Sequence, residues 1–310
     1  MQKTYSYEEL PVILKVKSPV LMLDRLSVDI DAKSAVGSKM VSMNEVVFQG
    51  HFPGQPVLPG VLQVAMMDQA ARALHEACFP GEGVVTVIAL RKVKFRTPVL
   101  PGMALKVVCE LAQETEGGKV EYSIKAVVEG TEDVASSAYI TLERKSAEWF
   151  APAPATGTAP FMAELPVDSV LSGPVAIMEH IPHRFPFMLL DGAYDLGKSN
   201  TIIGFKNVTG NDPLVNAVSP CRFDYCLQIE AGAQLGCAGM LSQPANKGML
   251  GFFMSIDTAE IIRPVLPGER LSMKITYEPH GKFGVASGEF YVGGVKVCAA
   301  TIKFALVPRS

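Results

Sequence analysis

The sequence lacks the features that mark several common classes of protein. Its six cysteines form no Cys-x-x-Cys pair, which argues against a zinc ribbon or a thioredoxin-like redox site. No apolar run reaches the roughly 18 residues that a membrane-spanning helix needs, and no secretory signal opens the chain. Lysine and arginine number 28 against 31 aspartate and glutamate, so no excess of positive charge favours nucleic acid. We therefore expect a cytoplasmic protein with reduced thiols, no membrane span and no nucleic-acid partner.

The 310 residues, of which 48% are hydrophobic, are enough for two domains with cores of their own. Residues 151–160 are rich in alanine and proline, a composition typical of a spacer. We expect a first domain over residues 1–145, a linker over 146–166 and a second domain over 167–310. The last five residues, 306–310, resemble the remnant of a cleavable tag.

The most informative stretch is Gly50–Leu62, where prolines and glycines form a stiff, irregular loop. Pro59 suits the start of a helix, and the apolar spacing that follows predicts one over residues 59–77. The first amides of that helix, Gly60 among them, would point outward at the positive end of the helix dipole. His51 beside such amides is suited to removing a proton next to a carbonyl that they polarise. The alternative is a histidine that only makes structural hydrogen bonds.

Alternating hydrophobicity predicts the strands of the first half. They are expected over residues 33–49, 84–99, 104–114, 119–129 and 134–143. Pro101–Gly102, Gly117–Gly118 and Gly130 separate the later strands, as turn residues do. One long buried helix followed by an antiparallel meander indicates the α+β class.

The second half of the chain repeats the first. The matching segments are Pro19–Asp24 with Pro186–Asp191, and Leu62–Gln69 with Leu227–Gln234. The offset of the helix places Glu230 opposite Ala65, and the same offset places Asn216 opposite His51. Each copy therefore carries half of an acid–base pair, with the histidine in the first copy and the carboxylate in the second.

Two of these segments resemble a known family. Gly50–Leu62 resembles the active-site signature of the β-hydroxyacyl-acyl-carrier-protein dehydratases (FabZ/FabA type), and Pro182–Asp191 resembles their N-terminal signature. The resemblance implies a double hot-dog fold, in which each repeat wraps an antiparallel sheet around a long central helix. The repeats would then pair as an intramolecular pseudo-dimer, and further assembly into a homo-oligomer stays open.

The family also implies the chemistry. A histidine from one subunit and a carboxylate from the other share each site, which makes His51 and Glu230 the expected catalytic pair. The substrate would be a β-hydroxyacyl thioester carried on the phosphopantetheine of an acyl carrier protein or on coenzyme A, with no cofactor and no metal. The mirror-image site, with Asn216 and Ala65, would lack both groups and be inactive.

The expected reaction removes water. His51, neutral near its reference pKa of about 6.5, would take the proton alpha to the thioester carbonyl. The Gly60 amide, preceded by Pro59, would stabilise the charge on the oxygen. Glu230, on an apolar helix face, would have a raised pKa and protonate the departing hydroxyl, giving a trans-2-enoyl thioester.

Neighbouring residues are expected to support this pair. Gln234 lies one helical turn beyond Glu230 and would bond backbone or orient the acid. The alternative for Glu230 is a buried ion pair with Arg184 or Arg222. Asp68 is disfavoured as a substitute acid because its spacing rotates it off the helix face. We expect His183 to pack beside the substrate channel. His75, His180 and His280 are expected at the surface or as capping residues.

A basic strand follows the first helix. Lys92, Lys94 and Arg96 alternate onto one face, with apolar residues between them. These charges either protect a solvated sheet edge or dock an acidic carrier protein.

Two other functions stay open at this point. A hot-dog acyl thioesterase would need an activated water but not the His51 loop, and it would release free thiol instead of a conjugated product. A catalytically dead acyl-binding or scaffold subunit would fit the loss of half of each motif. In that case, His51→Ala would leave the measured activity or the pathway output unchanged.

Overall fold

The computed structural model describes residues 1–115, 117–152, 156–195 and 197–308. Within these residues, fourteen strands form one antiparallel sheet in the order β1-β2-β3-β5-β6-β7-β4-β11-β14-β13-β12-β10-β9-β8. The strands are β1 (Gln2–Tyr5), β2 (Arg25–Asp29), β3 (Ser34–Met40), β4 (Val84–Phe95), β5 (Ala104–Glu114), β6 (Val120–Val128), β7 (Val134–Lys145), β8 (Leu171–Ser172), β9 (Gly192–Tyr194), β10 (Thr201–Asn207), β11 (Met249–Ile261), β12 (Arg270–His280), β13 (Phe283–Val292) and β14 (Val295–Pro308). The helices are α1 (Leu10–Leu14), α2 (Gly60–Cys78), α3 (Pro174–Met178) and α4 (Tyr225–Leu241), with 3-10 turns η1 (Val46–Gln49), η2 (Ala147–Phe150), η3 (Pro160–Glu164) and η4 (Pro244–Asn246).

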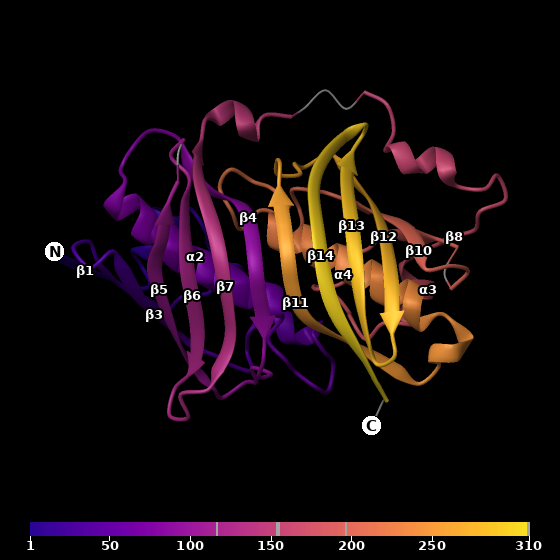
Figure 1. Ribbon diagram of the computed structural model, residues 1–310, viewed down its shortest axis with the longest axis horizontal. Helices are drawn as coiled ribbons and strands as arrows, with labels where there is room; N and C mark the ends of the chain where they lie inside the picture. Colours follow the sequence, from indigo (N-terminus) through magenta and orange to yellow (C-terminus); the bar gives the residue numbers. More distant parts are fainter. Residues whose placement is uncertain (116, 153–155, 196, 309–310) are drawn as a thin grey trace.

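The halves of the sheet meet where β4 pairs with β11. Lys94 lies opposite Ser255 and Leu90 opposite Ala259, so backbone hydrogen bonds continue from one half into the other. Figure 1 shows the indigo-to-magenta half and the orange-to-yellow half side by side across this seam. The expected antiparallel α+β architecture is confirmed.

The two long helices lie against the same side of the sheet (Figure 1). Nearly every residue of α2 and α4 is buried, and the two helices contact each other as well as the strands. Glycines allow α4 to approach the strands closely, since a Cβ at Gly232 would lie 2.6 Å from the ring of Phe290. The predicted helix over residues 59–77 is confirmed as α2. No helix among the described residues is long and apolar enough to cross a membrane.

The two repeats use the same internal hydrogen bonds. In the first, Gln69 accepts from the Met22 amide at 2.9 Å and donates to the Val20 carbonyl at 2.8 Å. In the second, Gln234 accepts from the Leu189 amide and donates to the Phe187 carbonyl, both at 2.9 Å. The same bonds at equivalent positions agree with a duplicated chain.

Several sequence expectations need correction. The strand expected over residues 33–49 ends at Met40, and η1 follows. The linker is partly structured, since η2 and η3 bury Phe150 and Phe161, while residues 153–155 lie outside the described part. The segment compared with a tag is also structured through residue 308, because Leu306 in β14 pairs with Gly251 in β11. Residues 309–310 lie outside the described part.

Gln69 gives a test of the shared core bonds. Gln69→Leu keeps the volume but leaves the Met22 amide and the Val20 carbonyl buried without partners, which should lower the free energy of unfolding by about 3 kcal/mol. Chemical denaturation measures this change. The control Gln113→Leu, on exposed β5 surface, should stay within about 0.5 kcal/mol of wild type. Equal stability of the two variants would contradict the assigned role of Gln69.

Candidate active site

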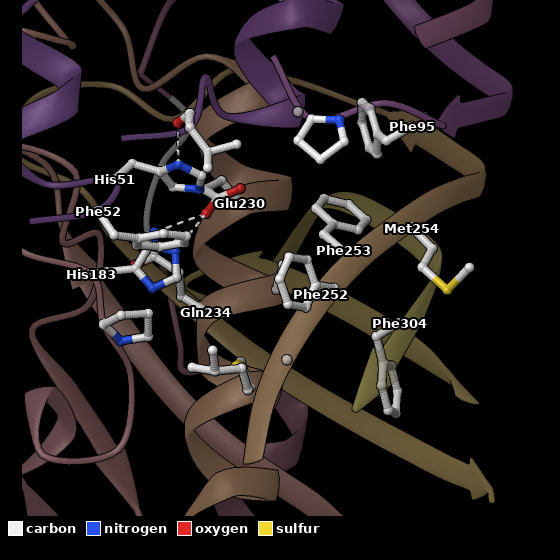
Figure 2. A pocket seen from close by; sticks show the side chains of 18 of the residues that line it. His51, Phe52, Phe95, His183, Glu230, Gln234, Phe252, Phe253, Met254 and Phe304 are labelled. Carbon is white, nitrogen blue, oxygen red and sulfur yellow. Dashed lines mark hydrogen bonds and ion pairs between the residues drawn. The ribbon is translucent and has the colours of Figure 1, made fainter. Parts of the chain in front are cut away.

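A cavity of about 840 Å³ lies where the two halves of the sheet separate. β4 pairs with β11 only from Ser255 onward, so residues 250–254 of β11 continue past the end of β4 and line the cavity. The loop after η1, the start of α2, the residues following β4, the Pro182–His183 segment and one face of α4 also line it, together with residues of β12, β13 and β14. Figure 2 shows His51, His183 and Glu230 gathered at one end, with Phe252, Phe253 and Met254 further along.

His51 is fixed by its own loop. Its Nδ1 lies 2.6 Å from the Val57 carbonyl oxygen, and the His51 carbonyl accepts from the Val57 amide at 3.0 Å. Nδ1 therefore carries the proton, because a carbonyl can only accept, and Nε2 is left with its lone pair. Burial, together with the neighbouring charge of His183, lowers the pKa of His51 to about 4, so the imidazole is neutral at physiological pH.

Glu230 reaches the same place from α4 in the other repeat. One donor atom each of His51, His183 and Glu230 lies within 4.8 Å of the other two. Glu230 Oε1 is 3.4 Å from His183 Nε2 and accepts from Gln234 Nε2 at 3.0 Å. The structure thus brings together the histidine and the carboxylate that the sequence placed in different copies, with Gln234 bonded to both backbone and acid.

The raised pKa expected for Glu230 is wrong. Burial does favour the neutral carboxyl, but the hydrogen bond and charge of His183, helped by His51 and Gln234, outweigh it and lower the pKa of Glu230 below its ordinary value. The alternative ion pairs are also wrong. Arg184 donates to backbone carbonyls, among them that of Ile181 at 2.8 Å, and Arg222 pairs with Asp224 at 3.0 Å.

Gly60 is the first residue of α2, with Pro59 as its N-cap, and it lines the cavity. Among the described residues, its amide donates to no other group, as expected in a first helical turn. A Cβ at this position would lie 2.8 Å from the Phe95 ring, so only glycine fits here without movement of the aromatic side chain.

The residue of the second repeat that is equivalent to His51 differs from the one expected. The Arg184 amide donates to the Gly50 carbonyl, and the Lys17 amide donates to the Ala217 carbonyl. The two bonds are equivalent, because the donors lie 167 positions apart and so do the acceptors. The residue opposite His51 is therefore Val218, not Asn216, because the second copy of the loop is two residues shorter before the helix offset of 165 resumes. Asn216 is exposed and donates to the Gly210 carbonyl.

Charged side chains fill the mirror-image region near Ala65. Asp68 pairs with Arg72 at 3.1 Å, and Arg222 and Asp224 are close enough to influence the same carboxyl. Burial raises the pKa of Asp68 to about 6 although Arg72 opposes the shift. Tyr225, opposite Gly60, is fully enclosed. Among the described residues, no histidine lies opposite Ala65, and this region holds charged side chains and the buried Tyr225 instead.

Other predicted residues fall in varied places. Lys92, Lys94 and Arg96 are exposed, and Arg96 lines the cavity mouth. Their strand is not a sheet edge, because β4 lies between β7 and β11. His75 was expected at the surface or as a capping residue. It is buried in the last turn of α2 with its Nδ1 3.1 Å from the Tyr122 hydroxyl, so the surface position is wrong, while its carbonyl accepts from the C-cap Phe79 amide.

The residue that sequence reasoning undervalued is His183. It is 8% exposed, lines the cavity and contacts both members of the pair, with its ring centroid 5.4 Å from that of His51. Its signal was present in the Pro182–Asp191 signature, but no spacing rule joins residue 183 to residues 51 and 230.

Comparisons with known proteins agree with this architecture. Residues 27–137 match the ApeI-like family, described as ApeI dehydratase. The 3-hydroxyacyl-acyl-carrier-protein dehydratase FabZ of Symbiobacterium thermophilum is 40% identical over 133 residues, which cover 42% of this chain and 94% of the relative. The chain belongs to this dehydratase family. The FabZ of Bacillus velezensis is 36% identical over 136 residues, covering 42% of this chain and 94% of its own.

Solved structures extend the likeness over both repeats. The dehydratase domain from the CurJ module of curacin polyketide synthase has a TM-score of 0.64 at 13% identity and covers 93% of this chain and 96% of its own. The dehydratase domain of RzxB from Pseudomonas fluorescens has a TM-score of 0.59 at 15% identity, and the match covers 92% of this chain and 98% of that domain. At these identities the likeness concerns the fold, and it confirms the hot-dog architecture.

The lowered pKa of His51 predicts a pH dependence of stability. Between about pH 6.5 and 4 the unfolded chain binds a proton at this histidine and the folded chain does not, so acidification removes up to about 3 kcal/mol of stability. His51→Asn should lack this loss, so its stability relative to wild type should rise as pH falls from about 7.5 to 4. Chemical denaturation at each pH, without divalent metals, measures it. Asn216→Ala should keep the wild-type dependence, and parallel curves for wild type and His51→Asn would contradict the assignment.

Proposed function

We propose that the chain dehydrates a β-hydroxyacyl thioester to a trans-2-enoyl thioester through a single composite site. The chain is a hydro-lyase of the dehydratase family to which it belongs. The observation that carries the site assignment is the placement of His51 from one repeat and Glu230 from the other within 4.8 Å at one end of a mostly apolar cavity.

His51 acts as the base. Its Nε2 lone pair faces the cavity because Nδ1–H is held by the Val57 carbonyl, and burial keeps the ring neutral. It removes the proton alpha to the thioester carbonyl. The charge that develops on the carbonyl oxygen is stabilised by the Gly60 amide at the N-terminus of α2, a type of contact worth about 3 kcal/mol.

Glu230 delivers the proton to the departing β-hydroxyl. Because its neighbours lower its pKa, the Glu230 carboxyl seldom holds that proton at neutral pH. His183, 3.4 Å away, can supply it, so the two groups act as one donor that shares a proton. Gln234 positions the carboxylate through its bond to Oε1 and through the two backbone bonds that fix its own amide.

The substrate enters as a thioester on a phosphopantetheine arm. The exposed Lys92 and Lys94 on β4 and Arg96, which directly follows this strand and lines the cavity, form a positive stretch that suits an acidic acyl carrier protein. The acyl chain lies among the aromatic and thioether side chains of β11 and the apolar face of α4. Proton transfer and amide donation come from the chain itself, so the reaction is proposed to need no cofactor.

A direct assay tests this function. A β-hydroxyacyl pantetheine thioester should give a conjugated enoyl product, detected by absorbance, without release of free thiol. His51→Ala and Glu230→Gln should each lower kcat by about 10²–10⁴-fold because each removes a proton-transfer group. Asn216→Ala is the control and should retain wild-type kcat. Thiol release, or full activity of His51→Ala, would reject the proposal.

Gly60 offers a second test. Gly60→Ala places a methyl group against the Phe95 ring and should displace the amide, lowering kcat by about tenfold or more. Adding Phe95→Leu provides room for the methyl group, so the double variant should recover most of the activity. The role assigned to the amide would be wrong if Gly60→Ala had wild-type kcat, or if the double variant were as slow as the single one.

Carrier-protein docking can be separated from catalysis. Reversing Lys92 and Lys94 to glutamate should raise KM about tenfold for the carrier-protein-bound substrate, because the attraction to an acidic partner becomes repulsion. The small pantetheine thioester should be unaffected. Lys106→Glu with Lys125→Glu makes the same charge change on β5 and β6 and serves as the control. An equal rise in KM for the Lys92/Lys94 variant and the Lys106/Lys125 variant would contradict the docking assignment.

A further inference from the structure

The cluster of His51, His183 and Glu230 has the composition of a metal site. One donor atom of each lies within 4.8 Å of the other two, and His183 Nε2 and Glu230 Oε1 are 3.4 Å apart. Two ligand atoms at about 2.05 Å from a tetrahedral zinc ion lie about 3.3 Å from each other. Two imidazoles with one carboxylate are a common donor set for zinc and other divalent transition metals. We propose that this cluster binds one such ion, of the Zn²⁺ class.

Two of the three ligands, His51 and Glu230, are already oriented by outer hydrogen bonds, whereas His183 Nδ1 has no hydrogen-bond partner among the described residues. His51 donates its Nδ1 proton to the Val57 carbonyl, which leaves Nε2 directed at the cluster. Gln234 donates to Glu230 Oε1 at 3.0 Å while its own amide is fixed to the backbone at Phe187 and Leu189. Metal-bound histidines and carboxylates usually have such partners, which fix the tautomer and the orientation. These partners hold His51 and Glu230 in place, and binding requires the three donor atoms to close from within 4.8 Å to about 3.3 Å of one another.

The cavity supplies the remaining coordination position. Three protein ligands with one open place are typical of accessible zinc sites, and the three side chains here lie at one end of a space of about 840 Å³. A water molecule or a thiol-containing ligand can therefore complete the tetrahedron. His183 and Glu230 are only 8% and 4% exposed, so the site is set apart from the solvent-facing acidic groups that often bind ions weakly.

A bound ion inhibits the dehydratase. It takes the Nε2 lone pair that His51 needs as a base, and it takes the carboxylate oxygen that passes the proton to the hydroxyl. This consequence rests on the proposed function, whereas the binding itself does not. Inhibition should be reversed by a chelator, because all three ligands stay in place when the ion leaves.

The test is a titration of the full chain, first treated with EDTA, with Co²⁺ followed by visible absorption, and then displacement by Zn²⁺. We expect one tightly bound ion per chain with the spectrum of a tetrahedral site. His183→Ala and Glu230→Gln should each weaken binding about tenfold or more, since each removes one ligand. Asn216→Ala and His280→Ala, which change residues outside the cluster, should bind as wild type does. Equal affinity of wild type and His183→Ala would overturn the proposal.

Activity measurements on the same samples keep this inference separate from the proposed function. Binding that depends on His183 and Glu230, in a protein without dehydratase activity, would support the metal site and reject the function. Dehydratase activity that Zn²⁺ leaves unchanged, with no ligand-dependent Co²⁺ spectrum, would reject the metal site alone. Thermal unfolding of each variant shows whether it is folded, and Glu230→Gln provides the result if His183→Ala does not fold.

Discussion

The backbone pairing of β4 with β11 determines where every functional group lies. It joins two half-sheets into one and brings α2 and α4 into contact behind them. The loop that holds His51 precedes α2, and Glu230 lies on α4, so the position of one group relative to the other depends on this seam. Because β4 ends at Phe95 while β11 begins at Met249 and pairs with β4 only from Ser255, a space stays open beside the pair.

Both faces of the pseudo-dimer bury a carboxylate, but they pair it with different partners. On the side of the cavity, the Glu230 carboxylate is paired with His183 and accepts a hydrogen bond from Gln234. On the mirror side, Asp68 is balanced by Arg72. A buried charge needs such a partner on either side, since an unpaired one costs several kcal/mol. One side of the pseudo-dimer thus has a cavity beside its buried carboxylate, and the equivalent region of the other side holds the Asp68–Arg72 ion pair.

The sequence predicted the elements well because their signals are local. The apolar spacing of α2 and the turn residues around β5, β6 and β7 placed these elements within a few residues. The pairing of His51 with Glu230 also followed, because the repeat aligns the two helices in register. Asn216 was wrongly placed opposite His51 because the helix offset was applied to a loop that is two residues shorter in the second repeat than in the first.

Electrostatics was harder to predict than geometry. The apolar neighbours of Glu230 along the helix suggested a raised pKa, but His183, whose hydrogen bond and charge contribute most to lowering that pKa, comes from a segment 47 positions earlier. The charges on β4 suggested a protected sheet edge, yet β11, which covers that edge, is more than 150 positions away. In both cases the deciding partner is distant in the sequence and becomes visible only in the fold.

Mixing two inactive variants tests the composite site most directly. If His51 and Glu230 of one chain form the site, co-expressed His51→Ala and Glu230→Gln chains should show no more dehydratase activity than either alone, because no single chain has both groups. If the site instead formed between chains, a histidine from one and a carboxylate from the other would meet, and the mixture would recover a substantial fraction of wild-type kcat. That recovery would contradict the account.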